Sequence, residues 1–323
     1  MNDVLAFFAA CLARPELLTA ACALVLVPPL AWLAVRAVTP TIHAMGDDHE
    51  WQAPLAAFAA TLPALLFVVI GIVTVRDAWG SPCLNYVTGR VMYAGIAAVT
   101  IFGFVRATIQ LCRRGAEVRR LVTLSRPASL LLANLKATQY TPARELESDK
   151  AFILLAGLFN PVVIVSSEAM RRLNSDELEA AIRHEVAHAC RGDQIISALV
   201  SFVADIVPLP AGGLVAVYRR AREFAADAHA VRHVDAMDLA SALLALAGGS
   251  PRFAGTAAFA EPGTVRGRLA VLLGDAPLVS SRWRRVLVTG VLSATFVFGA
   301  SPSIAAFASG VHCLTLTSDN RMK

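Results

Sequence analysis

Two histidines four residues apart, with a glutamate beside the first, give this chain its clearest chemical signal. His184, Glu185 and His188 form the pattern H-E-x-x-H inside residues 176–190, a run without glycine or proline. Because residues four apart lie on one face of a helix, the two imidazoles can bind a single Zn²⁺. Glu185 can then accept a proton from water at that ion and act as general base for peptide hydrolysis. The pattern also arises by chance, so its meaning depends on a third ligand.

A second helical run supplies candidates for the third protein ligand that a catalytic zinc requires. Glu223 and Asp227 are four positions apart within residues 218–229, so their carboxylates share one helix face. One can bind the metal while the other orients a ligating histidine. His229 and His233 are rival ligands, but they point away from the face of Glu223 on a straight helix. A solvated acidic pair on a basic helix is the plainer interpretation, since arginines are close by.

The two runs together resemble the gluzincin membrane peptidases. Residues 174–193 and 222–227 carry, in this order, an H-E-x-x-H helix with a nearby aspartate and an E-x-x-x-D helix. Two branches of these peptidases fit, the BlaR/MecR-type receptor proteases and the HtpX/CaaX-prenyl-protease type. Residues 156–165 are similar to the glycine- and proline-containing lead-in to a strand in the BlaR/MecR branch. The resemblance covers residues 150–273 and the membrane layout described below.

Carried over residue by residue, the resemblance implies a zinc site of the gluzincin type, with one Zn²⁺ per chain. Its implied members are the ligands His184, His188 and Glu223, the general base Glu185, and the supporting acids Asp227 and Asp193. Asp193 matches the aspartate that these families place shortly after the second histidine. The group that stabilises the oxyanion stays open, with candidates Arg222, His229 and His233.

The composition indicates a membrane protein. Of the 323 residues, 56% are hydrophobic and only 16% are charged, and the mean hydropathy is +0.60. These values lie outside the usual range of soluble proteins. A hydrocarbon core of ~30 Å requires about 20 apolar residues, and four stretches are long enough. They are residues 17–38, 54–75, 91–111 and 286–309.

The arginines predict the orientation of these spans, because basic residues collect on the cytoplasmic side. They gather in residues 112–120, after the third span, and in residues 281–285, before the fourth. Residues 112–281 are therefore expected to form a cytosolic peptidase domain. The other parts are three N-terminal spans within residues 1–111, an inner loop of residues 39–52, an outer loop of residues 77–89 and an outer tail of residues 310–323. The net charge of +5 is then mostly arginine near lipid headgroups, and no motif indicates direct nucleic-acid binding.

Residues 195–217 are nearly as apolar as a span, but a single crossing would separate His188 from Glu223. Residues 208–213 contain two prolines and two glycines and break the stretch into pieces too short to span alone. Asp205 also argues against exposure to lipid. We expect a bent pair of helices against the inner leaflet or the domain core. A hairpin that enters the membrane is the alternative.

The rest of the cytosolic domain is predicted to be mostly helical. Residues 121–135 should continue the third span as a helix, and residues 238–247 and 265–273 should close the domain. Residues 152–155 and 162–165 are short β-type runs, whose sheet edge can bind an extended substrate by strand addition. The predicted fold class is a mostly α membrane protein, with four transmembrane helices and a cytosolic α+β zincin-like domain.

The six cysteines show no C-x-x-C metal pattern. Cys190 is expected to be a small buried hydrophobe after the second histidine. Cys83 and Cys313 fall on the predicted outer side, where an oxidising environment permits a disulfide. They are therefore a candidate pair, and two unpaired cysteines on one side are the alternative.

These predictions indicate a multi-pass cell-membrane zinc endopeptidase that acts on protein substrates from the cytoplasmic side. The BlaR/MecR resemblance implies regulatory cleavage of a small DNA-binding repressor. An HtpX-like quality-control protease is the first alternative, and a non-enzymatic scaffold with structural zinc is the second. A structural site would need four protein ligands, whereas three are evident. Receptors of the BlaR/MecR branch that bind β-lactams carry a large external domain after the fourth span, which we do not expect here.

Overall fold

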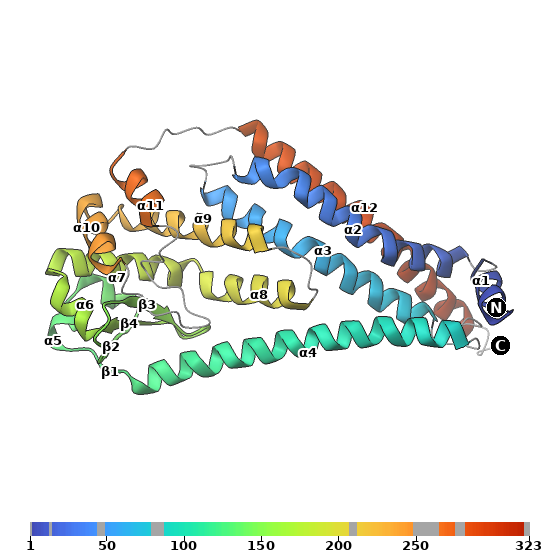
Figure 1. The fold of residues 1–323 in the computed structure, drawn as a ribbon, viewed down its shortest axis with the longest axis horizontal. Helices are drawn as coiled ribbons and strands as arrows, with labels where there is room; N and C mark the ends of the chain where they lie inside the picture. The colour runs from blue at the N-terminus through green and yellow to red at the C-terminus, as the bar shows by residue number, and fades with distance from the viewer. Residues whose placement is uncertain are drawn as a thin grey trace.

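The computed structural model describes residues 2–12, 15–43, 49–78, 87–206, 212–247, 265–274 and 282–319. The described chain is mostly helical, with long helices bundled at one end and a small sheet with shorter helices at the other (Figure 1). Helix α1 and the end of α12 lie at the end of the bundle far from the sheet (Figure 1).

Within the described part of the chain, five helices form the bundle, and three of them are long and apolar enough to cross a membrane. The helices are α1 (Asn2–Leu12), α2 (Pro15–His43), α3 (His49–Ala78), α4 (Val87–Leu124) and α12 (Arg282–Asp319). The candidate spans are Cys22–Ile42 in α2, Trp51–Arg76 in α3 and Val87–Leu124 in α4. They correspond to the first three predicted spans. Helix α12 packs against α2 and α3, and because its side chains are described only as far as Ser301, the fourth span stays a prediction.

Among the residues that the structure describes, the sheet has four short strands in the order β1-β2-β4-β3. The strands are β1 (Arg126–Pro127), β2 (Ala143–Leu146), β3 (Ile153–Ala156) and β4 (Val162–Ser166). Strands β2 and β4 are parallel, and the other two pairs are antiparallel. Alternate residues of β3 enter two different cores, Ile153 and Leu155 on the side of α7, and Leu154 and Ala156 on the side of α4, as the two-residue period of a strand requires.

The predicted helix over residues 121–135 is wrong in its length. Helix α4 ends at Leu124 and is followed by β1 and then by the short helix α5 (Leu130–Ala133). The physical reason is Pro127, which has no backbone N–H and disfavours helical backbone at the residue before it.

The remaining helices surround the sheet and connect it to the bundle. They are the 3₁₀ turn η2 (Lys136–Gln139), α6 (Ser167–Arg172), α7 (Ser175–Cys190), α8 (Asp193–Ile206), α9 (Gly212–Ala230), α10 (Ala236–Leu246) and α11 (Val265–Leu272). Helices α10 and α11 lie where closing helices were predicted, with slightly different ends.

The apolar stretch before Glu223 forms two separate helices, α8 and α9, and the residues between them, 207–211, lie outside the described part. Helix α8 packs along α4 and α9 packs along α3 (Figure 1). Asp205 of α8 forms an ion pair with Arg114 of α4 at 3.2 Å, and Ile206 lies directly against Gly103. Because Gly103 falls within the predicted span 91–111, this contact favours the alternative of a hairpin at the level of the membrane.

Candidate metal centre

The first half of the site lies on α7, whose ends are set by local signals. Asn174 caps the helix by accepting hydrogen bonds from the backbone N–H groups of Asp176 and Glu177, and Glu177 accepts one from Asn174 in return. After the helix, Gly192 has φ 65°, a left-handed conformation that favours glycine. This turn brings the following residue, Asp193, back to the helix.

The second half of the site lies on α9, which brings Glu223 to the two histidines. His184 Nε2 is 3.3 Å from Glu223 Oε2, and His188 Nε2 is 3.6 Å from Glu223 Oε1. The two Nε2 atoms are 3.2 Å apart. All three residues are at most 1% exposed, and their ligand atoms lie within 4.8 Å of one another. The structure therefore brings together the three residues that the sequence proposes as ligands.

The rival histidines lie away from this group. His229 is half-buried, His233 is exposed, and their ring centroids are 5.8 Å apart. Neither belongs to the metal-type grouping found among the described residues. The helical direction argued from the sequence agrees with their placement.

Each histidine of the group has a carboxylate on its other ring nitrogen. His188 Nδ1 lies 2.6 Å from Asp193 Oδ2, and His184 Nδ1 lies 2.8 Å from Asp227 Oδ1. A carboxylate at Nδ1 holds the proton there and leaves the lone pair of Nε2 for a metal. Both Nε2 atoms then face Glu223, so the tautomers suit metal binding.

Arg268 is a member of the site that the sequence reasoning missed. It comes from α11 and is fully buried. Its Nε and one terminal nitrogen donate hydrogen bonds of 2.7 Å to the two oxygens of Asp227, and the other terminal nitrogen donates to Glu223 Oε2 at 3.4 Å. A signal existed, since position 268 shares the helix face of the apolar residues 265, 269 and 272.

Arg222 binds the other carboxylate oxygen of Glu223. It donates hydrogen bonds to Glu223 Oε1 at 3.0 Å and to Ser197 Oγ at 2.7 Å, and the Ser197 hydroxyl is 3.0 Å from the Tyr218 hydroxyl. These contacts connect α8 to α9. Arg222 is therefore better suited to fix the position of Glu223 than to donate a hydrogen bond to an oxyanion.

Glu185 lies beside the histidines without a complete set of partners. It is buried, and among the described residues its Oε2 has no hydrogen-bond partner. Burial raises the pKa of Glu185 to about 7, although the two imidazoles oppose this shift. A buried carboxylate oxygen without a partner is costly unless water or a ligand reaches it, so this atom is suited to hold a water molecule.

The charges of the site favour a cation at the position of the imidazoles. Burial disfavours the charged form of His188, but the carboxylates of Glu223 and Asp193 outweigh it and raise the pKa of His188 to about 9. The imidazoles and Arg222 in turn hold the pKa of Glu223 well below its usual range despite its burial. A divalent cation would provide the positive charge that this arrangement stabilises.

The edge strand β3 is less accessible than the sequence suggested. It lies beside α7, but its four residues are at most 1% exposed. The carbonyl of Leu155 already accepts a hydrogen bond of 3.2 Å from the Gln194 side chain. A substrate strand could pair with this edge only after its present cover moves.

The predictions for Cys190 and for the pair Cys83 and Cys313 have different outcomes. Cys190 is exposed, so the prediction of a buried side chain is wrong, because the last turn of α7 points that position away from the core. Cys83 and the side chain of Cys313 lie outside the described residues, and their pairing stays a prediction.

Comparison with known proteins agrees with the geometry. The family model described as BlaR1 peptidase M56 matches residues 83–272, which is more than half of the chain and includes α7, α9 and α11. A curated relative, Protease HtpX of Thioalkalivibrio sulfidiphilus (strain HL-EbGR7), is 46% identical over 46 residues. That match spans 14% of this chain and 16% of the relative.

Proposed function

This chain belongs to the BlaR1 peptidase M56 family, and from that premise we propose that it is a membrane zinc endopeptidase with a cytoplasmic active site. The observation that carries the proposal is the buried group of His184, His188 and Glu223, whose ligand atoms lie within 4.8 Å of one another. Beside it, Glu185 presents an oxygen that has no hydrogen-bond partner among the described residues. Metal ligands next to a carboxylate that can hold water are the parts of a hydrolytic site.

The donor set fits zinc. Two imidazole nitrogens and one carboxylate oxygen match the three protein ligands of catalytic zinc sites, which keep a further position open. A structural site is closed by four protein ligands, and the described residues offer three here. The proposal of an enzyme is therefore better supported than that of a scaffold.

The roles of the individual side chains follow from their contacts. A zinc ion held by His184, His188 and Glu223 would polarise a scissile carbonyl and lower the pKa of water towards ~7. Glu185 takes the proton from the attacking water and passes it to the leaving amine. Asp193 and Asp227 hold the imidazole rings, while Arg222 and Arg268 hold the carboxylate of Glu223 in place.

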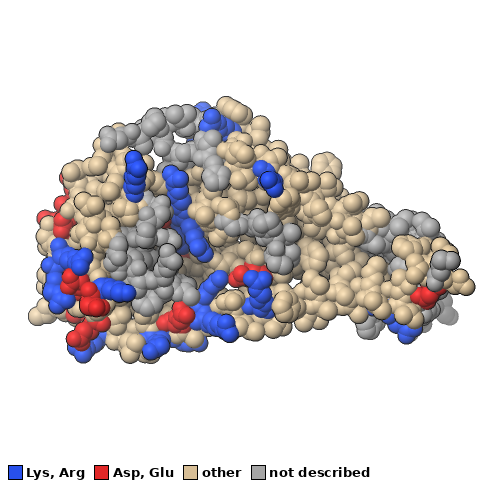
Figure 2. Space-filling view, in the orientation of Figure 1, with Lys and Arg blue, Asp and Glu red and all other residues tan. Residues whose placement is uncertain are grey.

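The proposed orientation rests on the distribution of basic side chains. Figure 2 shows Lys and Arg gathered over the half of the molecule that carries the sheet, and few charged side chains along the bundle. The arginines of residues 112–120 lie in the C-terminal part of α4 and those of residues 282–285 at the start of α12, and both segments lie toward this half (Figure 1). Under the positive-inside rule this half would face the cytoplasm, so the metal centre would lie on the same side of the membrane as cytosolic proteins.

We further propose that the physiological substrate is a cytosolic DNA-binding repressor, as the BlaR/MecR-type resemblance implies. The test compares the proteomes of cells that carry the wild type or Glu185→Gln. One or a few cytosolic proteins should accumulate intact in the mutant. The local match to Protease HtpX supports the second candidate, membrane-protein quality control, which predicts that many membrane proteins accumulate instead. An unchanged proteome would support the third candidate, a non-enzymatic membrane scaffold.

A further inference from the structure

Helix α9 presents two neighbouring faces at the metal centre. Glu223 and Asp227, one turn apart, face α7, where both contact His184. Tyr218 and Arg222, also one turn apart, face α8. Because Arg222 and Glu223 are consecutive, their side chains leave the helix about 100° apart and do not face each other. The Arg222 side chain must therefore turn back to reach the Glu223 carboxylate, to which it donates a hydrogen bond of 3.0 Å.

Ser197 of α8 anchors the other side of the Arg222 guanidinium. The second terminal nitrogen of Arg222 donates a hydrogen bond of 2.7 Å to Ser197 Oγ. A guanidinium has no acceptor, so Ser197 must be the acceptor in this contact. A long side chain that would otherwise sample many rotamers is thereby held in one of them. The contact with Ser197 fixes the direction from which Arg222 meets Glu223.

The Tyr218 hydroxyl provides a second partner for Ser197. It lies 3.0 Å from Ser197 Oγ, and Tyr218 is only 3% exposed. A serine hydroxyl has one proton and two lone pairs, so it can accept from Arg222 and form a second hydrogen bond with Tyr218. This second bond restricts the rotation of the Ser197 hydroxyl and keeps a lone pair directed at Arg222.

The Arg222 contact acts on the Glu223 oxygen that lies nearer to His188. This oxygen, Oε1, lies 3.6 Å from His188 Nε2. The other oxygen, Oε2, lies 3.3 Å from His184 Nε2 and accepts a hydrogen bond from Arg268. Each carboxylate oxygen of the proposed ligand thus has its own arginine. Loss of either contact should let the carboxylate rotate and move its oxygens relative to the two imidazoles.

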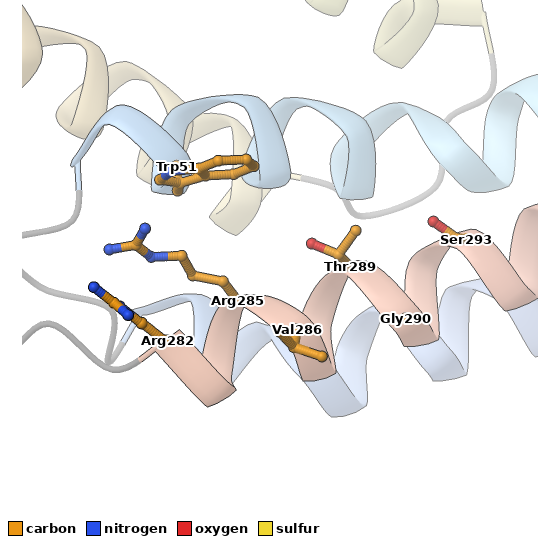
Figure 3. A pocket seen from close by; sticks show the side chains of 7 residues that line it. All are labelled: Trp51, Arg282, Arg285, Val286, Thr289, Gly290 and Ser293. Atoms are coloured by element: carbon orange, nitrogen blue, oxygen red, sulfur yellow. The ribbon is translucent and has the colours of Figure 1, made fainter.

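Arg222 is enclosed by the protein, unlike arginines that border a cavity. Figure 3 shows a pocket of about 470 Å³ between α3 and α12, where Arg282 and Arg285 are among the lining residues. None of the described residues that line it comes from α7, α8 or α9. Arg222 is only 4% exposed, and both of its terminal nitrogens are bound within the protein. Its contacts therefore hold neighbouring side chains.

We propose that Ser197 and Tyr218 are positioning residues for the metal ligand Glu223 and act on it through Arg222. The proposal rests on the proposed function, because it requires that Glu223 binds zinc. Helix α8 also carries Asp193, which contacts one of the ligating histidines. This helix would then support two of the three proposed ligands, although it carries none of them.

The first test measures the zinc affinity of the full chain in detergent micelles, by competition with a chromogenic chelator. Ser197→Ala should weaken zinc binding by about 10-fold or more, within the range of about 10–100-fold for groups that support a metal ligand. Tyr218→Phe should weaken it less, because it acts one contact further away. Ser197→Thr keeps the hydroxyl and should bind nearly as the wild type does. The matched control is Ser201→Ala, at a half-buried position one turn further along α8, which should leave zinc affinity unchanged.

A double-mutant cycle separates positioning through Arg222 from a general effect on α8. In Arg222→Gln, which lacks the guanidinium, Ser197→Ala should cause no further loss of zinc affinity. Co²⁺ in place of zinc provides a second readout, since its visible absorption bands depend on the ligand geometry. These bands should shift in Ser197→Ala and stay as in the wild type in Ser201→Ala.

The outcomes distinguish this proposal from the proposed function. Wild-type zinc affinity in Ser197→Ala, or an equal loss from Ser197→Ala with and without the Arg222 guanidinium, would overturn the positioning role and leave the zinc site intact. A wild type that binds no zinc would overturn the proposed function and the positioning role together. None of these readouts depends on peptidase activity.

Discussion

Arg268 and Asp227 are joined by two hydrogen bonds of 2.7 Å, although they lie 41 positions apart in the chain. Asp227 in turn contacts His184 Nδ1 at 2.8 Å. Helix α11 therefore supports the metal centre through Asp227. Loss of Arg268 should consequently disturb the proposed ligand His184, which lies on a different helix.

Replacement of Arg268 should weaken both the fold and metal binding. Arg268→Ala leaves the buried carboxylate of Asp227 without its cation, which costs about 3–5 kcal/mol of unfolding free energy. Metal affinity should fall by about 10–100-fold, as for other groups that orient a ligating histidine. Thermal unfolding and zinc titration of the purified protein measure the two effects.

One further variant separates charge from geometry at position 268, and a second variant on the same helix is its control. Arg268→Lys keeps the charge but loses the two-pronged contact, so it should restore stability more than metal affinity. Arg266→Ala, at an exposed position of the same helix, should change stability by no more than about 0.5 kcal/mol. If Arg268→Ala folds and binds zinc as tightly as the wild type, Arg268 does not support the metal site.

The ligand assignment predicts a specific pattern of zinc content. Purified protein should contain about one zinc per chain, and His184→Ala, His188→Ala or Glu223→Ala should lose it. Glu185→Gln should keep the metal and lose proteolysis, because Glu185 acts on the proton of water and not on the metal. Elemental analysis and a peptide-cleavage assay provide the measurements.

His229→Ala and His233→Ala are the controls for that series, since both side chains lie outside the grouping of the described residues. Each should retain zinc. Zinc that survives Glu223→Ala and disappears with either control variant would show that the third ligand has been misassigned.

The extent to which the site could be predicted from the sequence depends on how local its contacts are. His184 and His188 are one helical turn apart, and so are Glu223 and Asp227. Spacing alone therefore predicts that the members of each pair share a helix face. Arg268 reaches them only when the chain returns from α11, and spacing cannot predict such a contact. Its place on the apolar face of α11 indicates burial at most, and not which groups it contacts.

The fold shows the same division between local and distant effects. The strands β3 and β4 are predicted from their own residues, whereas the end of α4 is not, because the apolar pattern of residues 121–135 continues past Pro127. The cover over β3 includes Gln194 of α8. That contact joins residues 39 positions apart, and no pattern within the strand indicates it.

Close packing between α4 and α8 should depend on Gly103. A Cβ at this position would meet the backbone carbonyl of Ile206, which cannot rotate away as a side chain can. Gly103→Ala should therefore displace α8 and cost about 1–3 kcal/mol. Because α8 begins at Asp193, the contact of Asp193 with His188 should weaken too, and zinc affinity should fall with stability.

Gly95→Ala is the matched control on the same helix, since a Cβ there meets no atom within 4 Å. It should be neutral or slightly stabilising, because alanine is the better helix former. Equal effects of the two substitutions on thermal unfolding would show that α8 does not pack on Gly103.

The proposed topology predicts which cysteines a membrane-impermeant maleimide reaches in intact cells. Cys83 and Cys313 should be labelled only after reduction, because an oxidising exterior permits the disulfide that we propose between them. Cys112 and Cys190 are exposed on the protein but lie on the proposed cytoplasmic side. They should be labelled only after lysis, with or without reductant. Mass spectrometry of the labelled peptides assigns each site.

Labelling of Cys83 or Cys313 in intact cells without reductant would reject the disulfide, and labelling of either only after lysis would reject the orientation itself.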